Sequence, residues 1–264
     1  MSIHKSILDR QLFLVGDYPA VYPAGYSNPE QLVQWKDVQT CLNNPWWYNV
    51  EMLDNSNMKV PMPTVPEQWH DKMVPEKSVI FDLANSNNTF VIGKYGHHNR
   101  AVEDLLDEIE TQFYVNCDAH VYGALGGASS FKIHWDQPAN LIIQIEGETD
   151  WTVYNERCST LIKYDGYPYN PTEEEVTPCI THKMLPGDVL YIPARSYHCA
   201  RPHDRRLSLS IPMWHDPEYQ SDRKEHEPAK GGNALDRENR SKTCWCLRIQ
   251  EVRQIIFVKN TNEK

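Results

Sequence analysis

The sequence predicts a mainly β protein, in which short strands form a barrel or sandwich with flanking helices. Two observations predict this fold class. Apolar runs of strand length recur through the second half of the chain, and clusters of turn-forming residues separate them. The 18 prolines and the 11% of aromatic residues also suit a chain rich in strands and loops. The expected strands are residues 115–125, a strand ending near 136, and residues 141–146, 150–154, 189–193 and 207–213.

A wrapping segment is expected to precede the domain that contains these strands. Residues 1–75 are rich in Pro, Asn and aromatic side chains, and we expect them to wrap around the barrel, with a helix near Pro29–Lys36. Residues 76–214 are the expected barrel domain. Near its start, residues 99–112 predict an amphipathic helix with Asn99 as its N-cap. The apolar positions at helical spacing are Val102, Leu105, Leu106 and Ile109.

Two later segments interrupt or follow the strands. Residues 164–181 contain three prolines and an acidic run, which predict a long insertion. Such loops commonly shape the entrance to a substrate site. Residues 215–264 are expected to form a charged connector and then an apolar element at 244–258. That element is expected to dock on the barrel or on another subunit, so a homodimer remains open.

The composition narrows the classes of function. The formal net charge of −10 argues against a broad nucleic-acid surface, so we expect no nucleic-acid partner. No apolar run approaches the length of a membrane span, and the first residues lack the apolar stretch of a signal peptide. Seven scattered cysteines favour a reducing compartment over a disulfide framework. We therefore expect a cytoplasmic protein with no membrane association.

The most specific motif is a His-x-Asp pair followed by a distant histidine. Side chains at i and i+2 of a strand share one face, so His134 and Asp136 are expected to point the same way. His198 follows a second buried strand and its turn. Two imidazoles and one carboxylate on adjacent strands form the facial triad of non-heme Fe(II) oxygenases, which leaves coordination positions open. We predict that these three residues bind a metal ion and are catalytic.

The sequence around this motif resembles a known family. Residues 134–151 read HWDQPANLIIQIEGETDW, residues 184–193 read MLPGDVLYIP, and residues 207–211 read LSLSI. In this order and spacing they resemble the JmjC-like cupin oxygenases, most closely the branch of the bacterial ribosomal-protein hydroxylases. Met184 stands where that pattern has leucine. The resemblance implies a double-stranded β-helix (cupin or jelly-roll) barrel, with Fe(II), 2-oxoglutarate as co-substrate, and O2.

One position departs from the family pattern. The resembling enzymes hold the distal carboxylate of 2-oxoglutarate with a basic residue fifteen positions after the first metal histidine, and here that residue is Thr149. We predict that Arg206 replaces it, because a guanidinium pairs with a carboxylate in two parallel hydrogen bonds. By strand alternation Arg206 shares a face with Ser208 and Ser210. Lys132 is the alternative cation, and the Thr149 hydroxyl is expected to assist either one.

Family resemblance adds Asn140 and Tyr122 as polar contacts to the co-substrate. The expected function is a 2-oxoglutarate-dependent dioxygenase that hydroxylates a C–H bond of a peptide, protein side chain or small amino-acid-like molecule, releasing succinate and CO2. Demethylation of an N-methyl group uses the same chemistry and remains open. Two alternatives also remain: a metal-dependent cupin of another reaction class, which the Thr149 departure favours, and a barrel that binds without catalysis.

Overall fold

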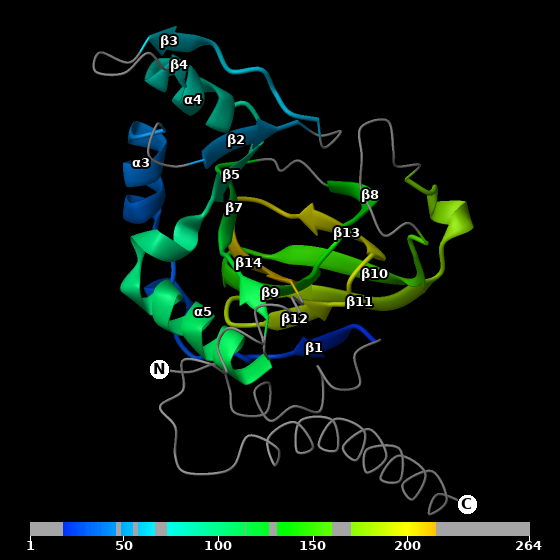
Figure 1. Cartoon of the computed structure of the whole chain (residues 1–264). Helices are drawn as coiled ribbons and strands as arrows, with labels where there is room; N and C mark the ends of the chain where they lie inside the picture. Colours follow the sequence, from blue (N-terminus) through cyan, green and yellow to red (C-terminus); the bar gives the residue numbers. More distant parts are fainter. Residues whose placement is uncertain are drawn as a thin grey trace, which may run out of the picture.

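The computed structural model describes residues 18–45, 49–54, 58–66, 73–113, 115–126, 131–159 and 170–214. Within these ranges the chain folds into two facing sheets with helices on one side (Figure 1). The segments 215–264 and 244–258, for which a connector and a docking element were predicted, lie outside the described residues. No helix in the described ranges is long and apolar enough to cross a membrane.

The larger sheet has the strand order β1-β12-β9-β14-β7-β5-β2, with β6 also pairing with β14. All of its pairs are antiparallel. Its strands are β1 (Ala20–Tyr22), β2 (Asn49–Leu53), β5 (Thr89–Gly93), β6 (Asn116–Cys117), β7 (His120–Ala124), β9 (Ala139–Glu146), β12 (Val189–Ile192) and β14 (Arg206–Trp214). The first and last strands of this order, β1 and β2, come from the segment that was expected to wrap around the barrel.

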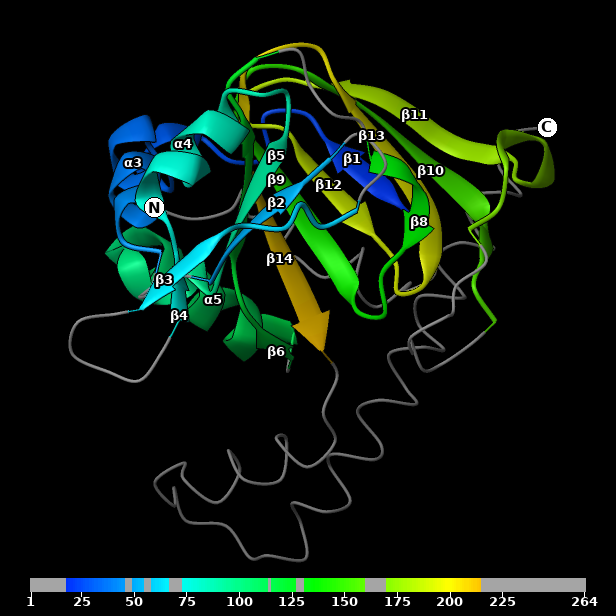
Figure 2. The ribbon, with the colours of Figure 1, turned by 90° about the horizontal axis from the view of Figure 1, so that it is seen from above.

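The smaller sheet has the order β11-β10-β13-β8 and faces the larger one (Figure 2). Its strands are β8 (Phe131–Trp135), β10 (Thr149–Arg157), β11 (Pro178–Met184) and β13 (Ser196–Pro202). A separate hairpin joins β3 (Thr64–Pro66) to β4 (Met73–Pro75). Two facing antiparallel sheets joined in this way form the predicted jelly-roll barrel, so the expected fold class is confirmed.

Side chains alternate between the two faces of a strand, so the two faces of the larger sheet contribute to different apolar cores. On β14, Leu207, Leu209 and Ile211 pack with the helices that cover the outer face of the larger sheet. These helices are α3 (Trp35–Asn43), α4 (Lys77–Ala84) and α5 (Arg100–Phe113). Elsewhere in the described residues, short 3-10 turns are formed by Pro29–Gln31, Tyr95–His98 and Glu173–Glu175. A smaller core between the sheets includes Ile142 and Val153. The inner positions of β14 are thereby left for polar side chains.

The helix expected near residues 29–36 was placed wrongly. Residues 29–31 form a single 3-10 turn, and the α-helix begins at Trp35. Gln34 and Asp37 form a capping box that starts the helix there. By contrast, the helix predicted over 99–112 is confirmed as α5, and the Asn99 side chain accepts a hydrogen bond of 2.8 Å from the backbone amide of Ala101. The insertion predicted over 164–181 also ends earlier than expected, since β11 begins at Pro178.

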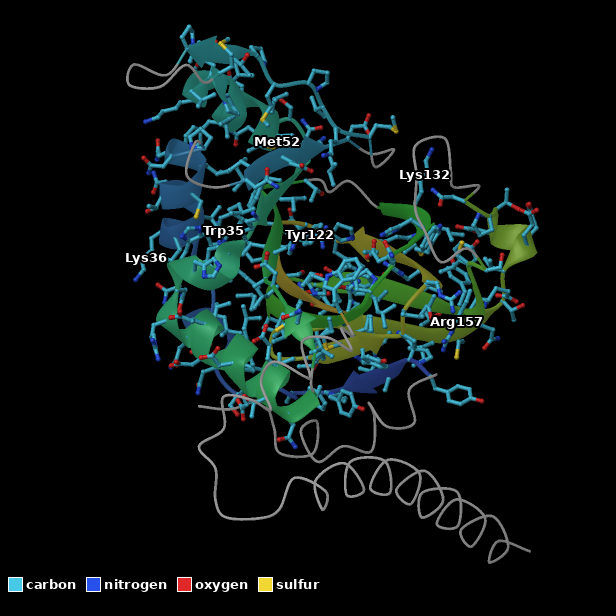
Figure 3. The ribbon with its side chains drawn as sticks, in the orientation of Figure 1. Trp35, Lys36, Met52, Tyr122, Lys132 and Arg157 are labelled. Atoms are coloured by element: carbon cyan, nitrogen blue, oxygen red, sulfur yellow. The ribbon has the colours of Figure 1, made fainter. Side chains whose placement is uncertain are left out.

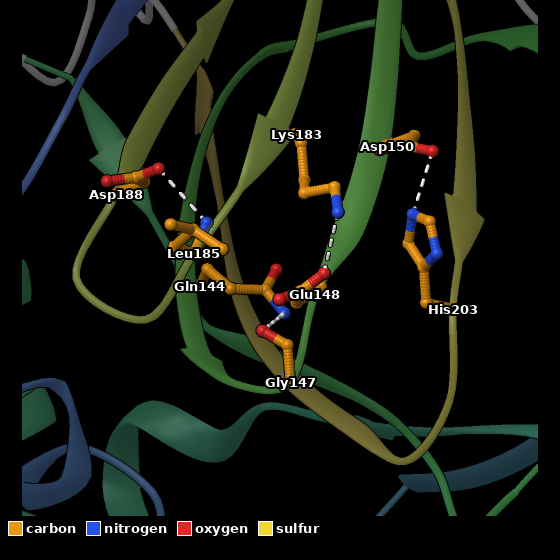
Figure 4. A network of polar contacts seen from close by, with 8 residues as sticks. All are labelled: Gln144, Gly147, Glu148, Asp150, Lys183, Leu185, Asp188 and His203. Atoms are coloured by element: carbon orange, nitrogen blue, oxygen red, sulfur yellow. Dashed lines mark hydrogen bonds and ion pairs between the residues drawn. The ribbon is translucent and has the colours of Figure 1, made fainter.

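A network of turn residues closes the end of the barrel near Gly147 (Figure 4). Gly147 has a φ of +74°, and a Cβ added there would lie 2.2 Å from the carbonyl oxygen of Arg205, so the turn requires glycine. The Gln144 side chain donates hydrogen bonds to the carbonyl oxygens of Glu146 and Gly147. The Oε1 of Gln144 accepts a hydrogen bond of 3.0 Å from the Ser208 hydroxyl. The β9–β10 turn is therefore tied to β14 beside Arg206.

Candidate metal centre

The pairing of β8 with β13 brings the two predicted metal histidines face to face. His134 is directly opposite His198 in the register of the two strands. Their ring centroids are 4.3 Å apart, and Asp136 follows the end of β8 with its Oδ2 3.6 Å from the Nε2 of His198. One possible ligand atom from each of the three side chains lies within 4.8 Å of the others. Residues separated by more than sixty positions in the chain thus converge on one point, as the sequence motif predicted.

Hydrogen bonds to the backbone determine which ring nitrogen each histidine presents. The Nδ1 of His134 lies 2.8 Å from the carbonyl oxygen of Lys132, and the Nδ1 of His198 lies 2.9 Å from that of Ser196. A carbonyl oxygen only accepts, so each Nδ1 carries the proton and donates it. Each Nε2 then keeps its lone pair as a potential metal ligand. The same i to i−2 arrangement on both strands orients the two rings.

The carboxylate of the cluster is held by a neighbouring amide. The Nδ2 of Asn140 donates a hydrogen bond of 3.0 Å to the Oδ2 of Asp136. Asn140 is 4% exposed, and the Ser210 hydroxyl lies 3.5 Å from its Oδ1. Asn140 is not among the residues that line the pocket beside the metal cluster. In this structure Asn140 orients Asp136, and its contact with the co-substrate stays a prediction.

The three side chains form part of the wall of a cavity of about 130 Å³ between the two sheets. Arg206, Ser208 and Ser210 line it from β14, as strand alternation predicted, and Tyr122 lines it from β7. Its apolar wall consists of Leu53, Ile142 and Trp151. The cavity therefore combines a possible metal site, one guanidinium and several hydroxyl groups within an otherwise apolar enclosure.

Arg206 is the cation of this cavity wall. Its side chain is almost completely inaccessible, with 1% exposure. Burial lowers the pKa of the guanidinium to about 10, while the Tyr122 phenol acts in the opposite direction, so the group remains protonated at neutral pH. A charge in such a place is costly unless an anion or several hydrogen-bond acceptors face it. This part of the cavity is consequently suited to a carboxylate.

The pKa of the Tyr122 phenol is influenced by the charges of both Asp136 and Arg206. Burial raises the pKa of its phenol, the charge of Asp136 raises it further, and Arg206 lowers it. The net shift is upward, so the hydroxyl stays protonated and can donate a hydrogen bond. Figure 3 shows Tyr122 in the interior between the sheets and Lys132 at the outer end of β8. Lys132 is exposed and does not line the cavity, so the structure does not bring it to the other predicted residues.

Thr149 occupies an interior position at the start of β10. It is fully buried, and its Oγ1 has no hydrogen-bond partner among the described residues. It shares the inner face of β10 with Trp151, which does line the cavity. Thr149 itself is not among the residues that line the cavity, and it precedes Trp151 by two positions on the same face of β10.

Three apolar wall residues were not identified from the sequence as site residues: Leu53, Ile142 and Trp151. The Trp151 ring is stacked near His198, with centroids 6.0 Å apart and an interplanar angle of 30°. Its place on the inner face of a strand could have been inferred from the alternation of β10. Leu53 belongs to β2, which reaches the site only through pairing with β5. No sequence pattern near residue 53 indicates that Leu53 reaches the site.

Comparison with known proteins finds a family that resembles the part of the chain containing this centre. Residues 96–221 match the family model of the JmjC domain. This stretch of the chain is thus similar to the JmjC domain. The predicted resemblance to JmjC-like cupin proteins is thus confirmed, and the match covers all three residues of the metal cluster.

Two curated relatives resemble part of this chain. The bifunctional lysine-specific demethylase and histidyl-hydroxylase NO66 of Dictyostelium discoideum is 31% identical over 103 residues, which are 39% of this chain and 20% of that protein. The uncharacterized protein YxbC of Bacillus subtilis is 31% identical over 136 residues, which cover 44% of this chain and 41% of YxbC. The match spans less than half the length of either relative.

A solved structure resembles the described fold over most of the chain. It is YcfD, a ribosomal oxygenase from Escherichia coli, with a TM-score of 0.56 and 16% identity over 94% of this chain and 68% of that one. A second structure of YcfD, in complex with cobalt and 2-oxoglutarate, has a TM-score of 0.55 and covers 93% of this chain and 66% of that one, also at 16% identity. At this level of identity the likeness shows the fold alone.

Proposed function

We propose that this protein is an Fe(II)- and 2-oxoglutarate-dependent oxygenase that hydroxylates a C–H bond of a peptide, protein side chain or amino-acid-like substrate. The observation that carries the proposal is one cavity with two features. A cluster of His134, Asp136 and His198 lines the cavity, and the buried guanidinium of Arg206 lines the same cavity from the larger sheet. The first suits a metal ion and the second suits a dicarboxylate co-substrate.

The donor set fits a ferrous ion. Two neutral imidazole nitrogens and one carboxylate form the ligand set of non-heme iron oxygenases, and the cavity beside them leaves space for further ligands. Iron bound there supplies, with O2 and 2-oxoglutarate, the oxidation that converts a C–H bond to an alcohol and yields succinate and CO2. The hydrogen bonds at both Nδ1 atoms and at Asp136 Oδ2 hold the three ligands in position beforehand.

Arg206 is proposed to bind the distal carboxylate of 2-oxoglutarate. Its burial excludes water from such an ion pair, and a charge-assisted contact is stronger in an environment of low polarity. The Tyr122 hydroxyl and the Thr149 hydroxyl are proposed to donate to the same carboxylate. Because Arg206 supplies the positive charge that Thr149 lacks, the departure from the family pattern no longer favours a reaction without 2-oxoglutarate.

The remaining wall residues are proposed to shape the space above the metal. Trp151 packs beside His198, while Leu53 and Ile142 provide an apolar lining that limits the access of water to the reacting atoms. The names of the relatives, a histidyl-hydroxylase and a ribosomal oxygenase, support a protein substrate. The free cysteines at 41, 117, 158, 179 and 199 are consistent with the cytoplasmic setting that we propose.

Succinate release tests the proposal. Protein loaded with Fe(II) should convert 2-oxoglutarate to succinate, and Asp136→Ala should abolish the conversion. The matched control is Asp150→Ala, since Asp150 is an exposed partner of His203 (2.8 Å) outside the cavity. Metal bound by the wild type without succinate release would favour a cupin of another reaction class. Neither metal binding nor succinate release would favour a barrel without catalysis.

A further inference from the structure

Two serines of β14 contact two amide side chains of the neighbouring strand β9. Ser208 is directly opposite Gln144 in the register, and its Oγ donates a hydrogen bond of 3.0 Å to the Gln144 Oε1. Ser210 is opposite Ile142 and reaches diagonally to Asn140, where its Oγ donates to the Oδ1 at 3.5 Å. All four polar side chains are buried. Both serine–amide pairs lie on the inner face of the sheet, because the two serines and Ile142 line the cavity.

In each serine–amide pair the amide nitrogen donates to a third group. The Nε2 of Gln144 donates to the carbonyl oxygen of Gly147 (Figure 4). The Nδ2 of Asn140 donates to the Oδ2 of Asp136 at 3.0 Å. Carbonyl and ionised carboxylate oxygens accept hydrogen bonds and do not donate them, so the nitrogen of each amide has to face its third group. The amide oxygen then faces the serine, whose hydroxyl can donate to it.

The two pairs differ in what the third group does. Gln144 holds the β9–β10 turn, whereas Asn140 holds the carboxylate of the metal cluster. Asp136 follows the last residue of β8, so the pairing of that strand with β13 does not extend to it. Asn140 is 4% exposed, and water therefore cannot readily replace a hydrogen bond that its Oδ1 loses. The Ser210 hydroxyl consequently controls how firmly the amide beside Asp136 is held.

We infer that Ser210 is a positioning residue of the metal centre. It fixes the rotation of the Asn140 amide, and the amide in turn sets the direction of the Asp136 carboxylate. The inference rests on the proposed function, because a metal ion is the group that this carboxylate serves there. Ser208 has no such role, since its contact leads through Gln144 to the turn at Gly147. Two identical side chains on one face of one strand thus act on different parts of the site.

The test measures Mn(II) affinity of the full chain by titration calorimetry. Ser210→Ala should weaken Mn(II) binding by about two- to tenfold, the effect of one hydrogen bond. Ser210→Thr keeps the hydroxyl and should restore most of the affinity. The matched control is Ser208→Ala, which removes the same atom from the same face of β14 and should bind Mn(II) as the wild type does. In a protein that already carries Asn140→Ala, Ser210→Ala should cause no further loss, because the amide through which it acts is gone.

Unchanged Mn(II) affinity in Ser210→Ala, or an equal loss in Ser208→Ala, would overturn the inference. So would a further loss in the Asn140→Ala background, or a Ser210→Thr protein that binds Mn(II) no better than Ser210→Ala.

Urea unfolding of the metal-free proteins separates this inference from the proposed function. Ser210→Ala should lower the urea midpoint of the wild type but not that of Asn140→Ala, because the two side chains share one contact. Equal decreases in both backgrounds would show that Ser210 does not act on Asn140 and would overturn the inference. A wild type that binds no Mn(II) would count against the proposed function, while the urea comparison would still decide whether Ser210 fixes the amide.

Discussion

Replacing Arg206 with methionine separates the binding role of this residue from its role in the fold. The guanidinium is 1% exposed and lines the cavity, and burial lowers its pKa to about 10. Methionine is unbranched and apolar, so it fills much of the same space without the cost of a buried charge. Substitution of buried charged groups by apolar residues of similar volume is often neutral or stabilising.

The expected loss of affinity follows from the contact that is removed. A hydrogen bond to a charged group contributes about 1.5–3 kcal/mol, and 1.4 kcal/mol corresponds to a factor of ten. The dissociation constant of 2-oxoglutarate should therefore rise at least tenfold in Arg206→Met, and by about a hundredfold if both bonds of a bidentate pair are lost. The melting temperature without ligand should stay the same or rise. Affinity and stability should thus change independently.

Titration calorimetry with Mn(II)-loaded protein and thermal unfolding measure the two quantities. The matched control is Arg205→Gln, since the neighbouring arginine binds Glu146 on the exposed side at 2.6 Å and lies over the ring of Trp35 at 4.8 Å. That variant should keep the 2-oxoglutarate affinity of the wild type. Unchanged affinity in Arg206→Met would refute the assignment and direct the same experiment to Lys132. If Arg206→Met bound less 2-oxoglutarate only because a smaller fraction of the protein was folded, the separation of the two roles would be refuted.

Three further predictions concern the surroundings of the site. Asn140→Ala should weaken Mn(II) binding about 10- to 100-fold in calorimetry, because Asp136 loses its hydrogen bond, and unchanged affinity would show that this bond does not orient the ligand. Gly147→Ala should lower the free energy of unfolding by about 1–3 kcal/mol, whereas Gly126→Ala, where a Cβ meets nothing within 4 Å, should not; equal effects would contradict the strained-turn argument. The pKa of Arg206 is lower in the native state than in the unfolded state, so above about pH 10 the unfolded state binds more protons. The free energy of unfolding of the wild type should therefore rise relative to that of Arg206→Met between pH 8 and pH 11, as measured by urea unfolding. A constant difference between the two proteins would contradict that shift.

The parts of the site that could be predicted from the sequence depend on local periodicity. The convergence of His134 and Asp136 follows from the two-residue repeat of a strand, and the same rule placed Arg206 on the inner face of β14. Helix α5 was predictable because its apolar spacing and its Asn99 cap agree. In each case the signal lies within one element.

The parts that could not be predicted depend on pairing between distant segments. Leu53 reaches the cavity because β2 pairs with β5 and β5 pairs with β7, and no feature near residue 53 indicates that register. Asn140 was assigned to the co-substrate by resemblance, whereas its amide faces Asp136 across a turn. The choice between Lys132 and Arg206 likewise required the packing of the two sheets, because both have the parity of an inner residue.

A crystal structure of the protein with Mn(II) and N-oxalylglycine addresses the oxygenase assignment most directly. The metal should be bound by the Nε2 atoms of His134 and His198 and by a carboxylate oxygen of Asp136. The far carboxylate of the analogue should meet the guanidinium of Arg206. A metal ion bound elsewhere, or an analogue that leaves Arg206 untouched while a different cation holds its carboxylate, would contradict the assignment.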